Sequence, residues 1–228
     1  MKIQNQFKRY ELKYLLNTGQ YDAVMRAMSG LVVGDEYGRS TVCNVYYDTP
    51  DNKVIRRSLE KPIYKEKMRL RSYGTPRGDT RVFLELKKKY ESIVYKRRAD
   101  MTLDAARRFI AEPRPYSQIT REIAYFMELY APLQPAMFIS YEREAFFGAD
   151  DRDLRITFDR NILWRDHDVE LADGVYGAPV LDPGTVLMEL KVAAAVPLWI
   201  SALLARERIY PVSFSKYGRA YLDAQKRK

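Results

Sequence analysis

The chain has 228 residues, of which 46% are hydrophobic and 30% are charged, a composition typical of a folded globular protein and not of a disordered one. Its formal net charge of +9 indicates a polyanionic partner, which could be nucleic acid, polyphosphate, a nucleotide or an anionic membrane. The single cysteine and single histidine exclude an internal disulfide and a multi-histidine metal site.

No run of about 18 apolar residues is present, so we expect no membrane segment. The first ten residues carry three cations without an apolar stretch, which argues against a secretory signal. We therefore expect one cytoplasmic domain spanning residues 1–228. His167 stands between two aspartates in a polar stretch, and we interpret it as a solvated loop residue rather than a catalytic base.

Two periodicities recur along the chain. Alternation with period two predicts eight strands, at residues 7–15, 41–48, 63–73, 80–90, 92–98, 136–147, 153–164 and 185–192. Helical patterns that start at capping residues or prolines predict helices at residues 18–29, 49–58, 103–111, 118–130, 197–206 and 216–225. Short turns between successive strands favour hairpins, so the sequence predicts an α+β protein with a mainly antiparallel sheet.

Most of the predicted strands share an unusual pattern, in which one face is ionic. Lys65, Lys67, Arg69 and Arg71 share one face of a strand, while Met68 and Leu70 point the other way. Six further sets also share a face, which are Arg9, Glu11 and Lys13; Arg81, Phe83, Glu85, Lys87 and Lys89; Lys96 and Arg98; Tyr141 and Arg143; Arg155, Thr157 and Asp159; and Glu189 and Lys191.

Two interpretations of these faces are open. They are the solvated side of an ordinary half-buried sheet, or they line the interior of a sheet that closes on itself. Arginine is prominent among them, and its rigid fork suits phosphate oxygens. A channel lined by cations would require a polyanion or paired acids, because buried charge without a partner is costly.

Eight short segments, taken in order, resemble one known family. They are RYELKY at 9–14, VYYDT at 45–49, KMRLRSY at 67–73, FLELK at 83–87, YER at 141–143, LRITFD at 154–159, MELK at 188–191 and SFSKY at 213–217. Together they resemble the VTC (vacuolar transporter chaperone) domain, a polyphosphate polymerase module of the triphosphate tunnel metalloenzymes, which also include the CYTH-type triphosphatases. Each segment alone is weak evidence for this family, but the order and spacing of all eight over residues 6–221 are specific to it.

The resemblance implies a closed antiparallel eight-stranded β-barrel with flanking helices. It also implies transfer of the γ-phosphate of ATP to a growing inorganic polyphosphate chain with Mn²⁺ or Mg²⁺. Eight cations then match the catalytic, phosphate-binding positions: Lys13, Arg69, Arg71, Lys87, Arg143, Arg155, Lys191 and Lys216. Glu189 matches the metal-binding carboxylate, and Glu11 and Glu85 are further metal-binding or lysine-positioning candidates.

Two departures from the pattern are informative. CYTH hydrolases carry Glu-x-Glu-x-Lys near the N-terminus, whereas Arg9 stands first here, leaving Glu11 and Lys13. The lost carboxylate favours the VTC branch over two-metal hydrolysis. The fungal proteins also carry an N-terminal regulatory domain and a C-terminal membrane region, for which this chain has no counterpart, so it would act alone or with a separately encoded membrane partner.

Three alternatives to the polymerase remain. The same tunnel would serve a metal-dependent triphosphatase acting on inorganic triphosphate or ATP, or a non-catalytic module that binds polyphosphate or an inositol phosphate. A nucleic-acid partner is disfavoured, since the cations follow strand faces and no nucleic-acid motif occurs. The polymerase needs no histidine, cysteine or serine triad, because the terminal phosphate of the growing chain is already ionised.

Overall fold

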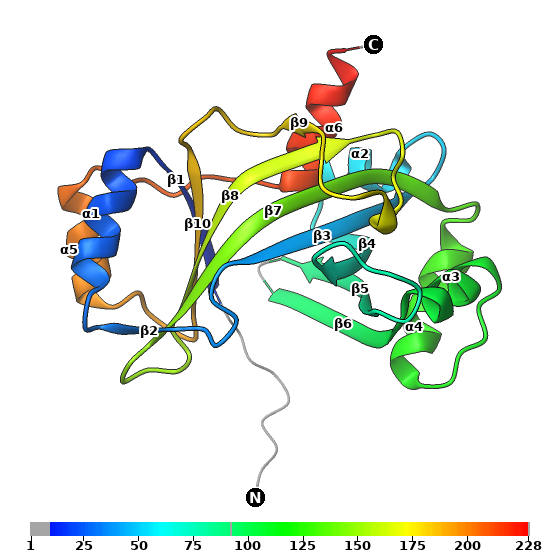
Figure 1. The fold of residues 1–228 in the computed structure, drawn as a ribbon, viewed down its shortest axis with the longest axis horizontal. Coiled ribbons are helices and arrows are strands. Elements are labelled where there is room, and N and C mark those ends of the chain that lie inside the picture. Colours follow the sequence, from blue (N-terminus) through cyan, green and yellow to red (C-terminus); the bar gives the residue numbers. More distant parts are fainter. Residues whose placement is uncertain (1–9, 92, 228) are drawn as a thin grey trace, which may run out of the picture. The chain divides into compact units, whose positions relative to one another are not determined.

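A computed structural model describes residues 10–91 and 93–227, and within these ranges the chain is α+β, with six α-helices and one large antiparallel sheet. The eight main strands follow the order β1-β10-β8-β7-β3-β4-β5-β6, and the short strands β2 and β9 pair with β7 and β8. The predicted α+β class and antiparallel sheet are therefore confirmed (Figure 1).

The bounds of the elements agree closely with the predicted ranges. The strands are β1 Tyr10–Leu16, β2 Val32–Gly34, β3 Ser40–Asp48, β4 Tyr64–Tyr73, β5 Arg81–Tyr90, β6 Ile93–Thr102, β7 Gln134–Gly148, β8 Arg155–Arg165, β9 Ala178–Pro179 and β10 Val186–Val192. The helices are α1 Thr18–Met28, α2 Lys53–Leu59, α3 Leu103–Ala111, α4 Gln118–Leu129, α5 Leu198–Arg206 and α6 Lys216–Gln225. Residues 7–9 and 92 of the predicted strands, Arg9 among them, lie outside the described residues.

Some details differ from the predictions. The N-cap of α1 is Asn17 and not Thr18, because Asn17 forms a capping box in which its side chain accepts from the Gln20 amide at 2.9 Å. Strand β6 continues to Thr102, four residues beyond the predicted end, since its last residues pair with the start of β5. Strands β2 and β9 have three and two residues, too few to produce a periodic pattern.

The chain forms two compact units. The first, here called the β10 unit, contains Met1–Ser40, Glu142–Asn161 and Leu181–Phe214. The second, the β4 unit, contains Thr41–Tyr141, Ile162–Val180 and Ser215–Lys228. The long strands β7 and β8 contribute residues to both.

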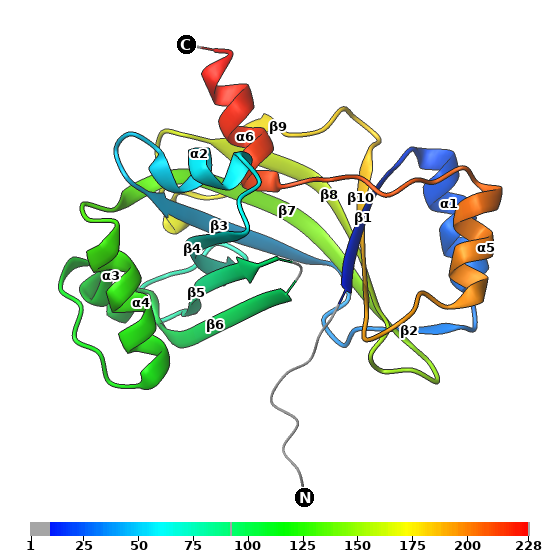
Figure 2. The ribbon, with the colours of Figure 1, turned by 180° about the vertical axis from the view of Figure 1, so that it is seen from behind.

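The β10 unit has its own apolar core beneath two helices. Helices α1 and α5 lie side by side in both views (Figures 1 and 2). Met28 of α1 and Leu203 of α5 belong to one buried cluster with Phe158 of β8 and Leu190 of β10. Burying each such side chain stabilises the fold by about 1.5–3 kcal/mol. The apolar faces of β1, β8 and β10 are thereby covered, and their ionic faces point the other way.

The β4 unit repeats this arrangement with a different set of helices. Phe109 of α3 and Phe126 of α4 pack in one core with Met68, Leu84 and Leu86 from β4 and β5. Because strand residues alternate, burial of these apolar positions leaves the ionic positions of β4, β5 and β6 on the opposite face. None of the helices in the described ranges is long and apolar enough to cross a lipid bilayer.

Helices α2 and α6 are tied together by one buried carboxylate. Asp48, at the end of β3, accepts hydrogen bonds from the amides of Val54 (2.8 Å) and Ile55 (3.0 Å) at the start of α2. It also accepts one from the Tyr217 hydroxyl of α6 at 2.8 Å. Its neighbour Thr49, expected at the start of this helix, precedes the first helical residue, Lys53. Asp48 therefore fixes the end of α6 that carries Lys216.

Candidate functional site

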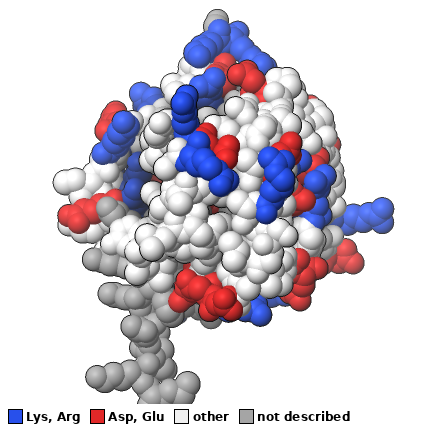
Figure 3. Space-filling view, turned by 90° about the vertical axis from the view of Figure 1, so that its left-hand side faces the viewer, with Lys and Arg blue, Asp and Glu red and all other residues white. Residues whose placement is uncertain are grey.

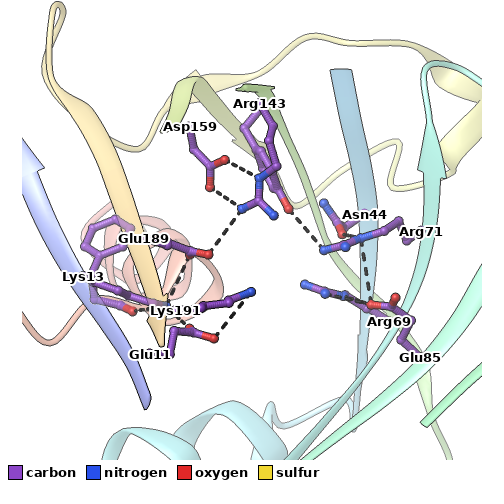
Figure 4. Close-up of polar contacts among 12 residues, drawn as sticks. Glu11, Lys13, Asn44, Arg69, Arg71, Glu85, Arg143, Asp159, Glu189 and Lys191 are labelled. Carbon is purple, nitrogen blue, oxygen red and sulfur yellow. Dashed lines mark hydrogen bonds and ion pairs between the residues drawn. The ribbon is translucent and has the colours of Figure 1, made fainter. Parts of the chain in front are cut away.

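The β10 unit brings six ionic side chains together on its polar face, and we call them the β10 cluster: Glu11, Lys13, Arg143, Asp159, Glu189 and Lys191 (Figure 4). The register places Glu11 opposite Lys191 and Lys13 opposite Glu189 on the paired strands β1 and β10. Acids and bases therefore alternate both along and across the two strands.

Lys13 stands between the two glutamates of this cluster. Its Nζ donates to the backbone oxygen of Phe214 at 2.9 Å and lies 3.4 Å from Glu11 Oε1 and 3.6 Å from Glu189 Oε1. Lys191 Nζ lies 3.8 Å from the other oxygen of Glu11. Burial lowers the pKa of Lys191, and the carboxylates of Glu11 and Glu189 oppose that shift.

Arg143 is held by a carboxylate that the sequence analysis did not include in the site. Its Nε and Nη2 donate to the two oxygens of Asp159 at 2.6 and 2.7 Å, and Nη2 also lies 3.4 Å from Glu189 Oε2. Asp159 is fully buried, so this two-pronged pair fixes the guanidinium firmly. The period-two pattern had placed Asp159 on this face. Its pairing with Arg143, 16 residues away, could not be predicted from the sequence.

Arg155 lies further along the same face, opposite Lys191 in register. Its Nη2 is 3.5 Å from Asp35 Oδ2, and its guanidinium lies 5.0 Å from the centre of the Phe147 ring. Of the predicted site residues, the β10 unit thus holds Glu11, Lys13, Arg143, Arg155, Glu189 and Lys191.

Two carboxylates of this cluster, Glu11 and Glu189, are the candidates for holding a divalent cation. Each has an oxygen near the Lys13 ammonium, at 3.4 and 3.6 Å. Mg²⁺ in phosphate-binding proteins commonly uses one or two carboxylates and completes its shell with phosphate oxygens and water. In the part of the chain that the structure describes, no group of three or more His, Cys, Asp or Glu side chains is arranged to hold a metal by itself.

The β4 unit carries a second assembly, here called the β4 cluster: Asn44, Arg69, Arg71, Glu85, Lys96 and Arg98. At its centre is Glu85, whose side chain is only 1% exposed. One carboxylate oxygen lies 2.7 Å from Arg69 Nη2, and the other lies 2.6 Å from Arg98 Nη2 and 2.8 Å from Lys96 Nζ. Arg71 Nε is 3.9 Å away. Four cations therefore surround one buried carboxylate.

Neutral groups complete the orientation of the two central arginines. Arg69 Nη1 donates to the Tyr46 hydroxyl at 3.0 Å. Arg71 Nε donates to Asn44 Oδ1 at 2.9 Å, and its Nη2 donates to the Tyr141 hydroxyl at 3.1 Å (Figure 4). These partners fix the guanidinium groups without neutralising them.

The electrostatics follow from this crowding. Burial acts to raise the pKa of the Glu85 carboxyl, but Arg69, Arg71 and Lys96 outweigh it and hold that pKa well below its usual range. Burial lowers the pKa of Lys96 to about 7, with Arg71 acting in the same direction and Glu85 opposing it. Although 42% of the Lys96 side chain is exposed, its ammonium is held against Glu85 and faces two guanidinium groups.

The remaining predicted cations of this unit lie on neighbouring positions. Lys87 is flanked in register by Lys67 of β4 and Lys96 of β6. Lys216 begins α6 after the capping residue Ser215, is buried, and has its ammonium 4.5 Å from the centre of the Tyr141 ring. The β4 unit thus contains Arg69, Arg71, Lys87, Lys216 and Glu85 from the predicted set.

Several polar residues of the β4 cluster were not predicted as site residues. Lys96 and Arg98 had been placed on one ionic face but were not predicted to belong to the site. They pair directly with Lys87 and Glu85 on the neighbouring strand, and a prediction of this hairpin pairing could have added them to the site. Tyr141 had likewise been placed on one face with Arg143, but its contact with Arg71 gave no signal because the two residues are 70 apart in the sequence. Asn44 and Tyr46 were not on any of the predicted ionic faces. His167 lies exposed in a loop, with its Nδ1 3.4 Å from Asp166 Oδ1, as predicted.

Comparison with known proteins agrees with this architecture. The sequence pattern of the VTC domain matches residues 8–224. The chain belongs to the VTC domain family. A search of the curated proteins finds no match.

Solved structures resemble this VTC domain over nearly its whole length. A candidate adenylate cyclase from Bacillus halodurans superposes with a TM-score of 0.58 at 11% identity, covering 91% of this chain and 93% of that one. A candidate adenylyl cyclase from Hippeastrum, described as having a dominant triphosphatase activity, gives 0.56 at 13% identity, covering 94% and 96%. A candidate adenylate cyclase from Vibrio parahaemolyticus gives 0.51 at 13%, covering 95% and 98%. With the family match, these likenesses confirm the expected CYTH-like triphosphate tunnel fold.

Proposed function

We propose that this VTC domain is a phosphotransferase that moves the γ-phosphate of ATP onto a growing inorganic polyphosphate chain, with Mn²⁺ or Mg²⁺ as cofactor. Its family membership supports a substrate with linked phosphates. The observation that favours this function most is the charge of the β4 cluster, where four cations share one buried carboxylate. Crowding four cations around a single carboxylate, with Arg69 and Arg71 largely buried, is costly unless a polyanion binds among them.

The architecture that we propose for the substrate site is the closed barrel implied by the family resemblance. In such a barrel the ionic strand faces would line the interior and the apolar faces would pack beneath the helices. The ionic faces and the covered apolar faces of each unit agree with this arrangement. An eight-stranded barrel has room for side chains and one slender ligand.

The chemistry requires little covalent help from the protein. A terminal phosphate oxygen of the polyphosphate chain attacks the γ-phosphorus of ATP, a new P–O bond forms, and the bond from that phosphorus to the β,γ-bridging oxygen breaks to release ADP. Arg69 and Arg71, held by Glu85, Tyr46, Asn44 and Tyr141, would bind and orient the phosphate oxygens and stabilise their charge.

The metal would be held by the β10 cluster. Glu189 and Glu11 would provide its carboxylate oxygens, and a bound divalent ion would supply further neutralisation of phosphate charge. Lys13, between these carboxylates, and Arg143, fixed by Asp159, would position the phosphate groups next to them.

One specific observation favours a second candidate function. The Hippeastrum protein of the same fold is described as having a dominant triphosphatase activity. In a triphosphatase, water would replace the polyphosphate chain as the attacking group, and the same cations would serve. Non-catalytic binding of polyphosphate or an inositol phosphate is the third possibility that the experiment below distinguishes.

A nucleic-acid partner is less well supported. The molecular face seen in Figure 3 has basic and acidic side chains interspersed with uncharged areas, whereas nucleic-acid binders concentrate cations in a patch or stripe. Apart from Lys96, which is exposed, the cations of both clusters are instead half-buried or buried on strand faces.

The products formed from ATP test the proposed function. Purified protein is incubated with ATP and Mn²⁺, with and without a short polyphosphate primer, and the products are resolved on a gel stained for polyphosphate. We expect a ladder that lengthens with time and disappears in Glu189→Gln and Arg69→Gln variants. Orthophosphate without a ladder would indicate a triphosphatase, and neither product, with polyphosphate binding retained, would contradict catalysis.

A further inference from the structure

One aromatic residue interrupts the ionic face of β5. The side chains on that face are Arg81, Phe83, Glu85, Lys87 and Lys89, and Phe83 is the single uncharged member of this set. In register it lies between Arg71 of β4 and Asp100 of β6, one step along the strands from Glu85 at the centre of the β4 cluster. An apolar ring on a polar face, next to the densest group of cations, is not explained by the binding of phosphate.

The surroundings of Phe83 form a small platform of flat groups. Tyr73, at the end of β4, meets it edge to face, with ring centres 5.8 Å apart and planes at 81°. The guanidinium of Arg98 lies 4.6 Å from the centre of the Phe83 ring, and that of Arg81 lies 5.5 Å from it. Half of Tyr73 is exposed and Phe83 is partly exposed, so both rings can be reached from solvent.

Such a platform suits a nucleobase. Aromatic rings and guanidinium planes stack on bases with little preference for sequence, because every base has a π-face. Successive side chains on one strand face are roughly 6.6 Å apart, about the length of a ribose that separates a base from its first phosphate. Arg98 contacts both the ring and Glu85, so it links the platform directly to the phosphate-binding cations.

We propose that Phe83, with Tyr73 beside it, recognises the nucleobase of a nucleoside triphosphate whose phosphates bind the β4 cluster. This inference rests on the proposed function, in that it takes the β4 cluster as the phosphate site. It adds that the domain distinguishes a nucleotide from inorganic tripolyphosphate, which carries the same phosphates but no group that could stack on Phe83.

The test is a comparison of two ligands on three proteins. The dissociation constants of ATP and tripolyphosphate are measured by calorimetry for the wild type, Phe83→Leu and Phe83→Ala. We expect both variants to lose roughly 5- to 150-fold in affinity for ATP, the range given by base–aromatic stacking, and to bind tripolyphosphate as the wild type does. Phe83→Leu keeps an apolar side chain of similar size, so it separates stacking from a loss of folding.

Tyr90→Ala is the matched control. Tyr90 is a second aromatic residue of β5 and is half-exposed, but it lies at the far end of the strand and on the opposite face. We expect this variant to leave both dissociation constants unchanged. Equal changes for ATP and tripolyphosphate in Phe83→Leu would overturn the inference while leaving the phosphate site intact. If the wild type binds neither ATP nor tripolyphosphate, the proposed function and the inference are both overturned.

Discussion

At the residue scale, the stability of the β4 cluster depends on Glu85. This buried carboxylate is the shared partner of Arg69, Arg71, Lys96 and Arg98. Glu85→Gln would leave these cations facing one another without an anion. We expect the free energy of unfolding, measured by urea denaturation, to fall by about 3–5 kcal/mol.

The matching control for Glu85 is Glu122, which pairs with Arg97 and Lys88 where its side chain is 24% exposed. Glu122→Gln should cost about 1 kcal/mol or less, because solvent screens such pairs. Added tripolyphosphate should restore part of the stability lost in Glu85→Gln, since it supplies the missing negative charge. A Glu85→Gln protein as stable as the Glu122→Gln protein would contradict the arrangement of this cluster.

Lys96 makes the binding of phosphate depend on pH. Burial lowers its pKa to about 7, so we expect it to lose its proton as the pH rises through 7. A bound polyanion favours the charged ammonium of Lys96, so binding above pH 7 requires the uptake of a proton. The affinity for the polyanion should therefore weaken as the pH rises above 7. Well below pH 7 the ammonium is already charged, and its contribution to the affinity is constant. We expect tripolyphosphate affinity to fall more steeply between pH 6.5 and 8.5 in the wild type than in Lys96→Arg, whose guanidinium stays charged.

Tripolyphosphate itself changes its ionisation over this pH range, which affects its binding to both proteins. Comparing the affinities of the wild type and Lys96→Arg at the same pH cancels this effect. Parallel pH profiles of affinity for the wild type and Lys96→Arg would show that Lys96 does not titrate in the site.

At the element scale, the alternation along β4, β5 and β10 allowed the sequence to predict which residues share an ionic face, because the register of a half-buried strand is fixed by its apolar side. Glu66 on β4 is an exception. It lies on the apolar side of the strand, buried, where it accepts hydrogen bonds from the Tyr64 hydroxyl at 2.8 Å and the Tyr130 hydroxyl at 3.1 Å. Tyr130 is 64 residues away, and such a partner could not be predicted from local pattern.

The attachment of α6 also belongs to this scale. Asp48 binds the first amides of α2 and the Tyr217 hydroxyl, so Asp48→Asn weakens the start of one helix and the anchoring of the other. We expect the melting temperature to fall, with a loss of about 2 kcal/mol or more in stability.

The same variant should also weaken tripolyphosphate binding, because Lys216 is held by α6 next to Tyr217. Tyr217→Phe, which removes only one of the bonds to Asp48, is the milder control and should lose about 1 kcal/mol. Full tripolyphosphate affinity in a destabilised Asp48→Asn protein would contradict the predicted role of Lys216 in the site.

At the scale of the whole molecule, each unit combines a helix-covered apolar core with a polar strand face, and the two polar faces differ in charge. The β10 cluster balances three carboxylates against three cations, Glu11, Asp159 and Glu189 against Lys13, Arg143 and Lys191. The β4 cluster sets four cations against one carboxylate. This division fits a metal-binding role for the first and a phosphate-binding role for the second.

The central claim is that the cations of the β4 cluster bind linked phosphates, and a titration of tripolyphosphate tests it most directly. The wild type, Arg71→Gln and a control on the opposite face of β6, Arg97→Gln, are titrated at two salt concentrations. We predict that the wild type binds, that salt weakens binding, and that Arg71→Gln lowers affinity about 10- to 100-fold while Arg97→Gln matches the wild type. Absence of binding by the wild type, or equal losses in the two variants, would contradict the account.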